Sequence, residues 1–185
     1  MGINLVKGQR VSIGLTNVGV GLGWDPNNSG SGFDFDLDAS AFMLGNTQKL
    51  PSDSYFVFYN NPLSPDSAIA SSGDDRTGGS SDGDDETLTV DLNKINSSIT
   101  EVVFAVSIHD AEARRQNFGQ VRNSFIRVYN ASTNEEICKY ELVEDFSVET
   151  CIEFGRLYKR GDEWKFEAMG LGYRGGLQEL VNKYS

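Results

Sequence analysis

The sequence predicts an all-β protein, a sandwich of two mainly antiparallel sheets with long loops and a few short helices. Nine or ten short segments alternate polar and apolar residues or form short apolar runs. Such alternation is typical of β-strands, because successive side chains of a strand point to opposite faces. Turn-forming residues separate these segments roughly every ten positions, and only residues 177–181 show a convincing helical pattern. Short strands joined by turns favour a sandwich over a βαβ arrangement.

In the N-terminal half, the predicted strands cover residues 10–15, 18–24, 32–39, 55–59 and 87–92. Glycine fills one whole face of the second of these strands, which permits another backbone or a ligand to approach closely. Residues 25–32 are rich in Asp, Asn, Ser and Gly and predict a turn.

The C-terminal half is organised around residues 102–108, a continuous apolar run that predicts a central strand covered on both faces. A polar segment, residues 110–123, follows and has room for one short helix. The remaining predicted strands cover residues 125–129, 136–142, 151–154 and 164–168. Turns such as 159–162 would join several of them as hairpins.

Length and composition indicate one domain over residues 1–185, without an internal repeat or a linker. No run of eighteen apolar residues is present, so we expect no direct membrane insertion. The N-terminus lacks the layout of a signal peptide. Cys138 and Cys151 are too few and too widely spaced for a disulfide framework or a zinc site. Buried, inert thiols in a reducing cytoplasm are the better interpretation.

The formal net charge of −11 disfavours binding to nucleic acid or to an anionic membrane and favours cations or basic partners. The acids are concentrated. Residues 71–86 contain six acids, one arginine and no apolar side chain. On composition alone, this segment predicts a disordered, solvated loop.

The predicted strand 32–39 alternates apolar residues with aspartates. Phe33, Phe35 and Leu37 would cover the core. Three carboxylates would then stand in a row on the other face: Asp34, Asp36 and Asp38. Like charges in a row repel each other, so we expect a positively charged group or ion close to this face.

A calcium ion takes six to eight oxygen ligands, which such a row can supply in part. A strand rises about 3.3 Å per residue, so we take the row to span roughly 13 Å, too far for one ion but suitable for two. The loop 74–86 would fold over the strand and add ligands, and Asp25 on the preceding turn is a further candidate. Magnesium is the rival ion, but it prefers a stricter octahedral geometry. One His and two unplaced Cys argue against zinc and copper.

Enzymatic alternatives are weaker. Residues 79–83 fit the G-x-S-x-G pattern of hydrolases, but they lie in an acidic loop that would oppose a developing oxyanion. A metal-dependent phosphoester hydrolase using the same acidic cluster is the main alternative, although the strand spacing places ions farther apart than the ~3.5–4 Å of two-metal enzymes. His109 is more readily a structural hydrogen-bonding residue than a catalyst. Arg114 and Arg115 form a basic island for the protein's own acids or for an acidic or phosphorylated partner.

Several motifs together resemble the TerD family of tellurium-resistance and stress proteins, over nearly the whole chain. They are Gly21-Leu22-Gly23-Trp24-Asp25, Asp34-Phe35-Asp36-Leu37-Asp38-Ala39-Ser40-Ala41-Phe42, Gly73-Asp74-Asp75-Arg76-Thr77-Gly78, Gly83-Asp84-Asp85-Glu86, residues 109–121, Glu163-Trp164-Lys165-Phe166 and residues 170–177. The chain departs from the family pattern at Asp75, where relatives have Asn, and in an acidic loop one residue longer.

The resemblance implies a cytoplasmic bacterial β-sandwich that binds two Ca²⁺ ions, in a family tied to stress resistance. We expect the protein not to be an enzyme, because the sequence indicates neither a nucleophile nor a general base. The resemblance also implies protein partners, in a membrane-associated complex with TerC-like proteins that would hold it peripherally at the inner membrane. The implied metal ligands are Asp36, Asp38, Asp74, Asp84 and Glu86, with Asp25, Asp34 and Asp82 as further candidates. Direct binding of a tellurium oxyanion is a third hypothesis, which the negative charge opposes.

Overall fold

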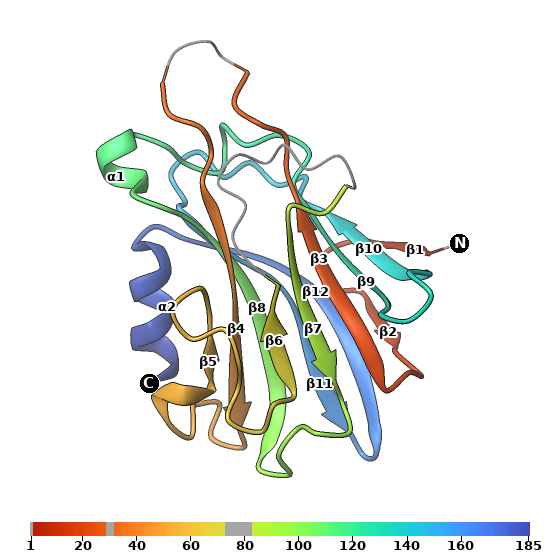
Figure 1. The fold of residues 1–185 in the computed structure, drawn as a ribbon. Helices are drawn as coiled ribbons and strands as arrows, with labels where there is room; N and C mark the ends of the chain where they lie inside the picture. The colour runs from red at the N-terminus through yellow and green to blue at the C-terminus, as the bar shows by residue number, and fades with distance from the viewer. Residues whose placement is uncertain (1, 29–31, 73–82) are drawn as a thin grey trace.

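The computed structural model describes residues 2–28, 32–72 and 83–185 of the chain, and within these ranges it contains two layers of β-sheet (Figure 1). The strands are β1 (Ile3–Leu5), β2 (Arg10–Ser12), β3 (Asn17–Gly23), β4 (Leu37–Gly45), β5 (Phe56–Val57), β6 (Ile69–Ser71), β7 (Glu86–Asp91), β8 (Ile99–Ile108), β9 (Phe125–Asn130), β10 (Glu136–Glu141), β11 (Cys151–Arg160) and β12 (Glu163–Tyr173). The helices are a 3₁₀ turn, Asp53–Tyr55, and the α-helices α1 (Ala111–Arg114) and α2 (Gly176–Tyr184).

One sheet has the strand order β1-β10-β9-β3-β7-β6, and the other has β2-β12-β11-β8-β4-β5. The pairing of β1 with β10 is parallel, and the other pairings between the described strands are antiparallel. The predicted all-β sandwich with few short helices is therefore confirmed.

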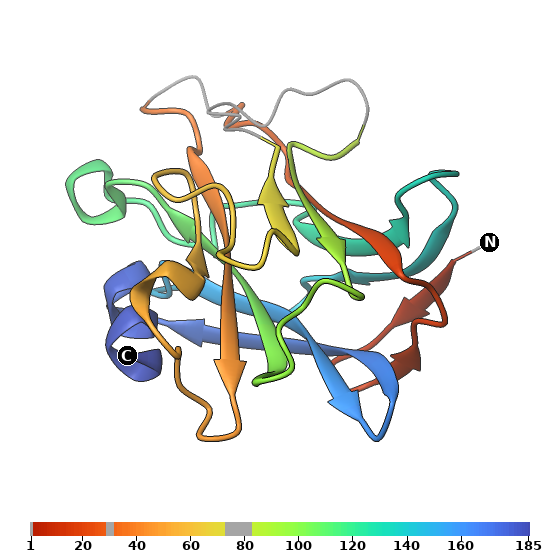
Figure 2. The same cartoon turned by 60° about the horizontal axis from the view of Figure 1, so that its bottom comes forward.

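The main core lies between the two sheets, where β3, β7 and β9 face β4, β8 and β11. The prediction for residues 102–108 is also confirmed, because β8 is buried on both faces. Val102 and Phe104 enter the main core, while Val103 and Ala105 pack in a second cluster with Leu180 and Tyr184 of α2. Helix α2 thus covers the outer face of the second sheet, as the blue helix in Figures 1 and 2 shows.

One prediction about the acidic stretch was wrong. The strand does not run over residues 32–39: β4 begins at Leu37 and continues to Gly45. Phe33 is 61% exposed, whereas Phe35 is 4% exposed and belongs to the core. The neighbouring strand explains the difference, because β8 ends at Ile108, the partner of Leu37. No described strand lies beside residues 33–36, so they cannot join a ladder.

Smaller differences concern strand ends. Strand β5 covers only two residues of the predicted 55–59 segment, and β11 and β12 both extend beyond their predicted ranges. Strands β1 and β6 were missed, because three residues are too few to show a pattern. A short helix after the central strand and a C-terminal helix were both predicted, and they are α1 and α2.

A candidate metal centre at the acidic end of the sandwich

The candidate ligands gather at one end of the sandwich, uppermost in Figure 1, where β3 ends and β4 and β7 begin. Asp25 follows β3, and Asp36 and Asp38 lie just before and within β4. Asp84 and Glu86 lie just before and at the start of β7. Asp74 and Asp82, also predicted as ligands, lie outside the described residues, as do residues 79–82 of the G-x-S-x-G segment.

Glu86 connects the two sheets. Its backbone pairs with Leu22 in the first sheet. Its carboxylate accepts a hydrogen bond of 2.5 Å from the backbone N–H of Ala39, in β4 of the second sheet. Glu86 is 5% exposed, and a buried carboxylate needs such donors. The carboxylate therefore joins the start of β7 in the first sheet to the start of β4 in the second.

Asp84 is held by Arg127 of β9. The guanidinium group donates two hydrogen bonds, from Nε to Oδ1 at 2.7 Å and from Nη2 to Oδ2 at 2.8 Å. This pair raises the pKa of Arg127, since the side-chain hydrogen bond and the charge of Asp84 outweigh burial. The guanidinium also lies over the ring of Tyr129, 4.4 Å from its centroid. Sequence reasoning missed Arg127; the signal was a lone arginine within a predicted strand.

The glycine face of β3 makes room for this pair. A Cβ atom on Gly21 would overlap the carboxylate of Asp84. On either side, Gly19 lies under the ring of Tyr129, and Gly23 lies under the ring of Phe125 and the backbone of Gly83. The glycine face thus permits close approach, as predicted, but side chains rather than another backbone occupy the space at Gly19 and Gly21, and the backbone of Gly83 approaches at Gly23.

Asp85, which was not among the predicted ligands, fixes the end of β3. Its carboxylate Oδ2 accepts a hydrogen bond from the backbone N–H of Trp24 at 2.8 Å, and its own N–H donates to the carbonyl of Leu22 at 2.7 Å. The segment before β7 is thereby fixed next to β3.

Asp36 and Asp38 each lie near a basic side chain. Arg114 Nη1 of α1 is 3.5 Å from Asp36 Oδ2, and His109 Nδ1 is 3.7 Å from Asp38 Oδ2. Both carboxylates are mostly covered, with side chains 13% exposed. The backbone N–H of His109 also donates to the carbonyl of Asp36 at 2.8 Å. These contacts agree with a structural role for His109.

Asp25 and Asp34 lie outside the strands, in the segment between β3 and β4. Asp34 is exposed and precedes β4. The Asp25 carboxylate accepts a hydrogen bond from Asn123 at 2.7 Å and lines a neighbouring pocket. Of the three aspartates predicted in a row on one strand, only Asp38 lies within β4, because the strand begins at Leu37.

The candidate metal ligands at this end of the sandwich are carboxylate oxygens, which are the type of ligand that a hard cation such as Ca²⁺ prefers. Gln116 adds a buried side-chain oxygen, Oε1, for which the described residues provide no hydrogen-bond partner, while its Nε2 donates to the carbonyls of Phe33 and Asp34. Within residues 2–28, 32–72 and 83–185, however, no three side chains of His, Cys, Asp or Glu form a metal-binding group. The described residues thus supply ligand candidates but not a complete site.

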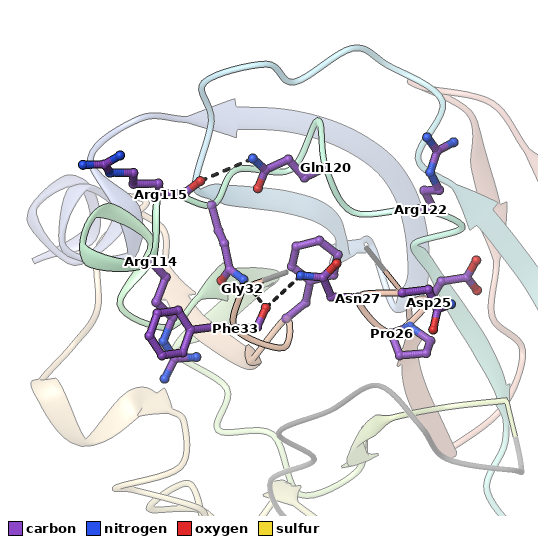
Figure 3. A pocket seen from close by; sticks show the side chains of 12 residues that line it. Asp25, Pro26, Asn27, Gly32, Phe33, Arg114, Arg115, Gln120 and Arg122 are labelled. Carbon is purple, nitrogen blue, oxygen red and sulfur yellow. Dashed lines mark hydrogen bonds between the residues drawn. The ribbon is translucent and has the colours of Figure 1, made fainter. Parts of the chain in front are cut away.

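A pocket of about 550 Å³ lies next to the acidic group (Figure 3). Its lining comes from the turn after β3, the segment before β4 and the segment after α1. These residues are Asp25, Pro26, Asn27, Asn28, Gly32, Phe33, Phe35, Arg114, Arg115, Gln116, Gln120 and Arg122.

The two cysteines are fully buried and free, as predicted. Burial raises the pKa of Cys138 to about 12 and raises that of Cys151 as well. Neither thiol is therefore available as a nucleophile in the folded protein. In the described part of the chain, no helix is long and apolar enough to cross a membrane.

The fold and the acidic residues at its end define a class of protein: a two-layer β-sandwich that carries carboxylates at the starts of β4 and β7. Comparisons with known proteins identify the class. Residues 1–184 match the family described as the TerD domain. The chain belongs to the TerD family.

Relatives of known name cover most or all of the chain. General stress protein 16U of Bacillus subtilis (strain 168) is 48% identical over 189 residues, covering 100% of this chain and 97% of the relative. Tellurium resistance protein TerD of Serratia marcescens is 48% identical over 146 residues, 79% of this chain and 76% of the relative. The crystal structure of SAV2460, a protein of unknown function, has a TM-score of 0.74 at 25% identity, covering 91% of this chain and 96% of that one.

Proposed function

We propose that this protein is a calcium-binding stress-response module of the cytoplasm that acts by docking partner proteins rather than by catalysis. The observation that carries the proposal is the position of Asp36, Asp38, Asp84 and Glu86 in the sequence of strands: all four lie at or just before the starts of β4 and β7, at one end of the sandwich. The names of the relatives supply the physiological context, general stress and tellurium resistance.

Calcium suits these donors better than other common ions. It accepts carboxylates, carbonyls and water in flexible geometry, so it can complete its shell with ligands from more than one loop. About two ions would be held, with Asp74 and Asp82 among the further ligands. Asp25 and Asp34 are the outermost candidates in this proposal.

Two arginines and a histidine lie beside the candidate ligands, as expected where carboxylates attract positively charged groups or hydrogen-bond donors. Arg114, His109 and Arg127 lie beside Asp36, Asp38 and Asp84 respectively. Clustered carboxylates repel each other, so internal cations stabilise the metal-free protein. A bound metal would supply a stronger positive charge at the same place, and the side chains would move aside.

Calcium titration of chelator-treated protein tests the proposal. Isothermal titration calorimetry should show binding, and the melting temperature should rise with the logarithm of calcium concentration above the Kd. The double variant Asp36→Asn/Asp38→Asn should lose at least tenfold in affinity. Asp53→Asn/Asp162→Asn is the matched control, since it removes the same charge from exposed positions outside the acidic end.

Absence of both heat and melting shift at millimolar calcium would refute the proposal, as would equal affinity in the two double variants. A screen of phosphoester substrates with magnesium or manganese checks the non-enzymatic part. Turnover that disappears in Asp36→Ala would favour the hydrolase alternative instead.

A further inference from the structure

The pocket beside the acidic group carries the opposite charge from the rest of the molecule. Arg114, Arg115 and Arg122 line it, in a protein with a net charge of −11. The acid on its wall, Asp25, is engaged by Asn123. The pocket is therefore a local basic site on an acidic protein, where an anion is attracted.

Two of these arginines have their charges available. Arg115 and Arg122 are exposed, and neither forms an ion pair with the described part of the chain. Arg114, by contrast, contacts Asp36 and lies over the ring of Phe33, 5.4 Å from its centroid. An exposed guanidinium without a carboxylate partner is suited to pair with a carboxylate on another molecule.

The pocket also presents an apolar surface. Phe33 is 61% exposed although it lies two residues from the core residue Phe35. Pro26 also lines the pocket. Exposed aromatic residues together with arginine are enriched at protein interfaces, where they act as anchors.

The placement of the arginines favours an extended ligand over a compact ion. Figure 3 shows Arg115 and Arg122 on opposite sides of the pocket, with Asn27 between them. Their guanidinium groups do not converge on one point, as they would for a small oxyanion. Two separated positive charges, with the exposed ring of Phe33 in the same lining, match an extended chain that carries carboxylates on both sides of an apolar residue.

We propose that this pocket receives an extended acidic segment of a partner protein. An apolar side chain of the segment enters the pocket against Phe33, and carboxylates before and after it pair with Arg115 and Arg122. This inference rests on the partner-docking part of the proposed function and specifies the chemistry of the partner. It does not require that calcium be bound.

A fluorescently labelled peptide tests the inference, with one phenylalanine flanked on each side by glutamates. We expect its anisotropy to rise on titration with the full chain and its affinity to fall with added salt. Arg115→Glu/Arg122→Glu should weaken binding at least tenfold, and Phe33→Ala should weaken it measurably. Lys159→Glu/Arg160→Glu makes the same charge change at exposed positions of the β11–β12 hairpin and should bind as wild type.

Equal weakening by both charge-reversal variants would overturn the proposal, because a general loss of charge would explain it. Equal binding of a peptide with lysines in place of glutamates would also overturn it, as would tighter binding of inorganic phosphate at the same arginines. Melting temperatures check that each variant folds. Calcium titration of the same variants keeps the two proposals apart, since Arg115→Glu/Arg122→Glu should still bind calcium.

Discussion

Arg127 and Asp84 form the pair most directly linked to the candidate metal centre. Their side chains are 16% and 10% exposed, so the fork of two hydrogen bonds is mostly shielded from water. A shielded ion pair of this kind compensates the desolvation of both groups only while both are present. Arg127 therefore holds Asp84 in place and at the same time neutralises it.

Replacing Arg127 with Gln should have opposite effects on folding and on metal binding. The metal-free protein should lose about 3 kcal/mol of unfolding free energy, since Asp84 is left without its cation. Calcium should bind roughly tenfold more tightly, because a competing positive charge is removed. Urea unfolding and calorimetric titration measure the two quantities. Arg127→Lys is the control that keeps the charge, and unchanged calcium affinity in Arg127→Gln would show that Asp84 is not a ligand.

Glu86 shows how one carboxylate can serve the fold and the site together. Glu86→Ala leaves the buried N–H of Ala39 without its acceptor, which should cost about 1–3 kcal/mol in chelator. Glu86→Gln keeps an acceptor oxygen and should cost less, while weakening calcium binding as much as the alanine variant. Denaturant titration separates the two effects. If both variants lose the same stability, the charge rather than the hydrogen bond matters.

Among the elements, α2 is attached to the second sheet by a buried acid. Glu153 of β11 is fully buried and accepts hydrogen bonds from Tyr173 at 3.0 Å, Lys183 at 2.9 Å and Tyr184 at 2.5 Å. Leu180 packs in the apolar cluster on the same face. The helix is thus held by both polar and apolar contacts with the sheet.

This attachment should weaken at alkaline pH. Burial lowers the pKa of Lys183, but hydrogen bonds with Tyr173 and Glu153 outweigh it and raise the pKa above 10.5. A raised pKa means that the contribution is complete below 10.5 and is lost as the pH rises through the folded-state value. Burial and the hydrogen bond to Glu153 likewise raise the pKa of Tyr184, so its contribution is lost above 10.0.

Thermal melts in a pH series measure this loss, which should begin near pH 10. Lys183→Met should remove the lysine part of the alkaline loss. The same substitution should lower the free energy of unfolding at neutral pH. Breaking a buried ion pair costs roughly 3–5 kcal/mol, and we expect a loss toward the low end of this range because the Lys183 side chain is partly exposed. A neutral-pH stability equal to wild type would mean that the tyrosines alone hold Glu153.

At the scale of the whole molecule, the net charge of −11 means that repulsion between carboxylates destabilises the fold, while local ion pairs stabilise it. Carboxylates collect at one end, and the charges of Arg114 and Arg127 offset only part of their charge. Long-range repulsion is screened when the Debye length falls, whereas the close, shielded pairs are affected less.

Raising the ionic strength from about 0.01 M to about 0.1 M shortens the Debye length from about 30 Å to about 10 Å. The melting temperature of the chelator-treated protein should therefore rise by several degrees in sodium chloride. Calcium at the same ionic strength should raise it further, because specific binding adds to screening. A fall in melting temperature with salt would show that attractive pairs dominate.

Much of the fold was predictable because burial leaves a local pattern in the sequence. The apolar run of β8, the glycine face of β3 and the inert cysteines all followed from the types of residue and their spacing. The acidic composition likewise indicated oxygen ligands. The strand assigned to residues 33–36 was wrong, because alternation alone does not say whether a neighbouring strand is present.

Which groups meet was decided only by the tertiary structure. Arg127 reaches Asp84 across 43 positions of sequence, and Glu86 reaches Ala39 across 47. Such contacts depend on the register and order of strands in two sheets, which no local pattern specifies. The sequence by itself determined that carboxylates gather at one end of a β-sandwich. The fold determined which of them carry a positive partner, because only packing brings distant side chains within hydrogen-bonding distance.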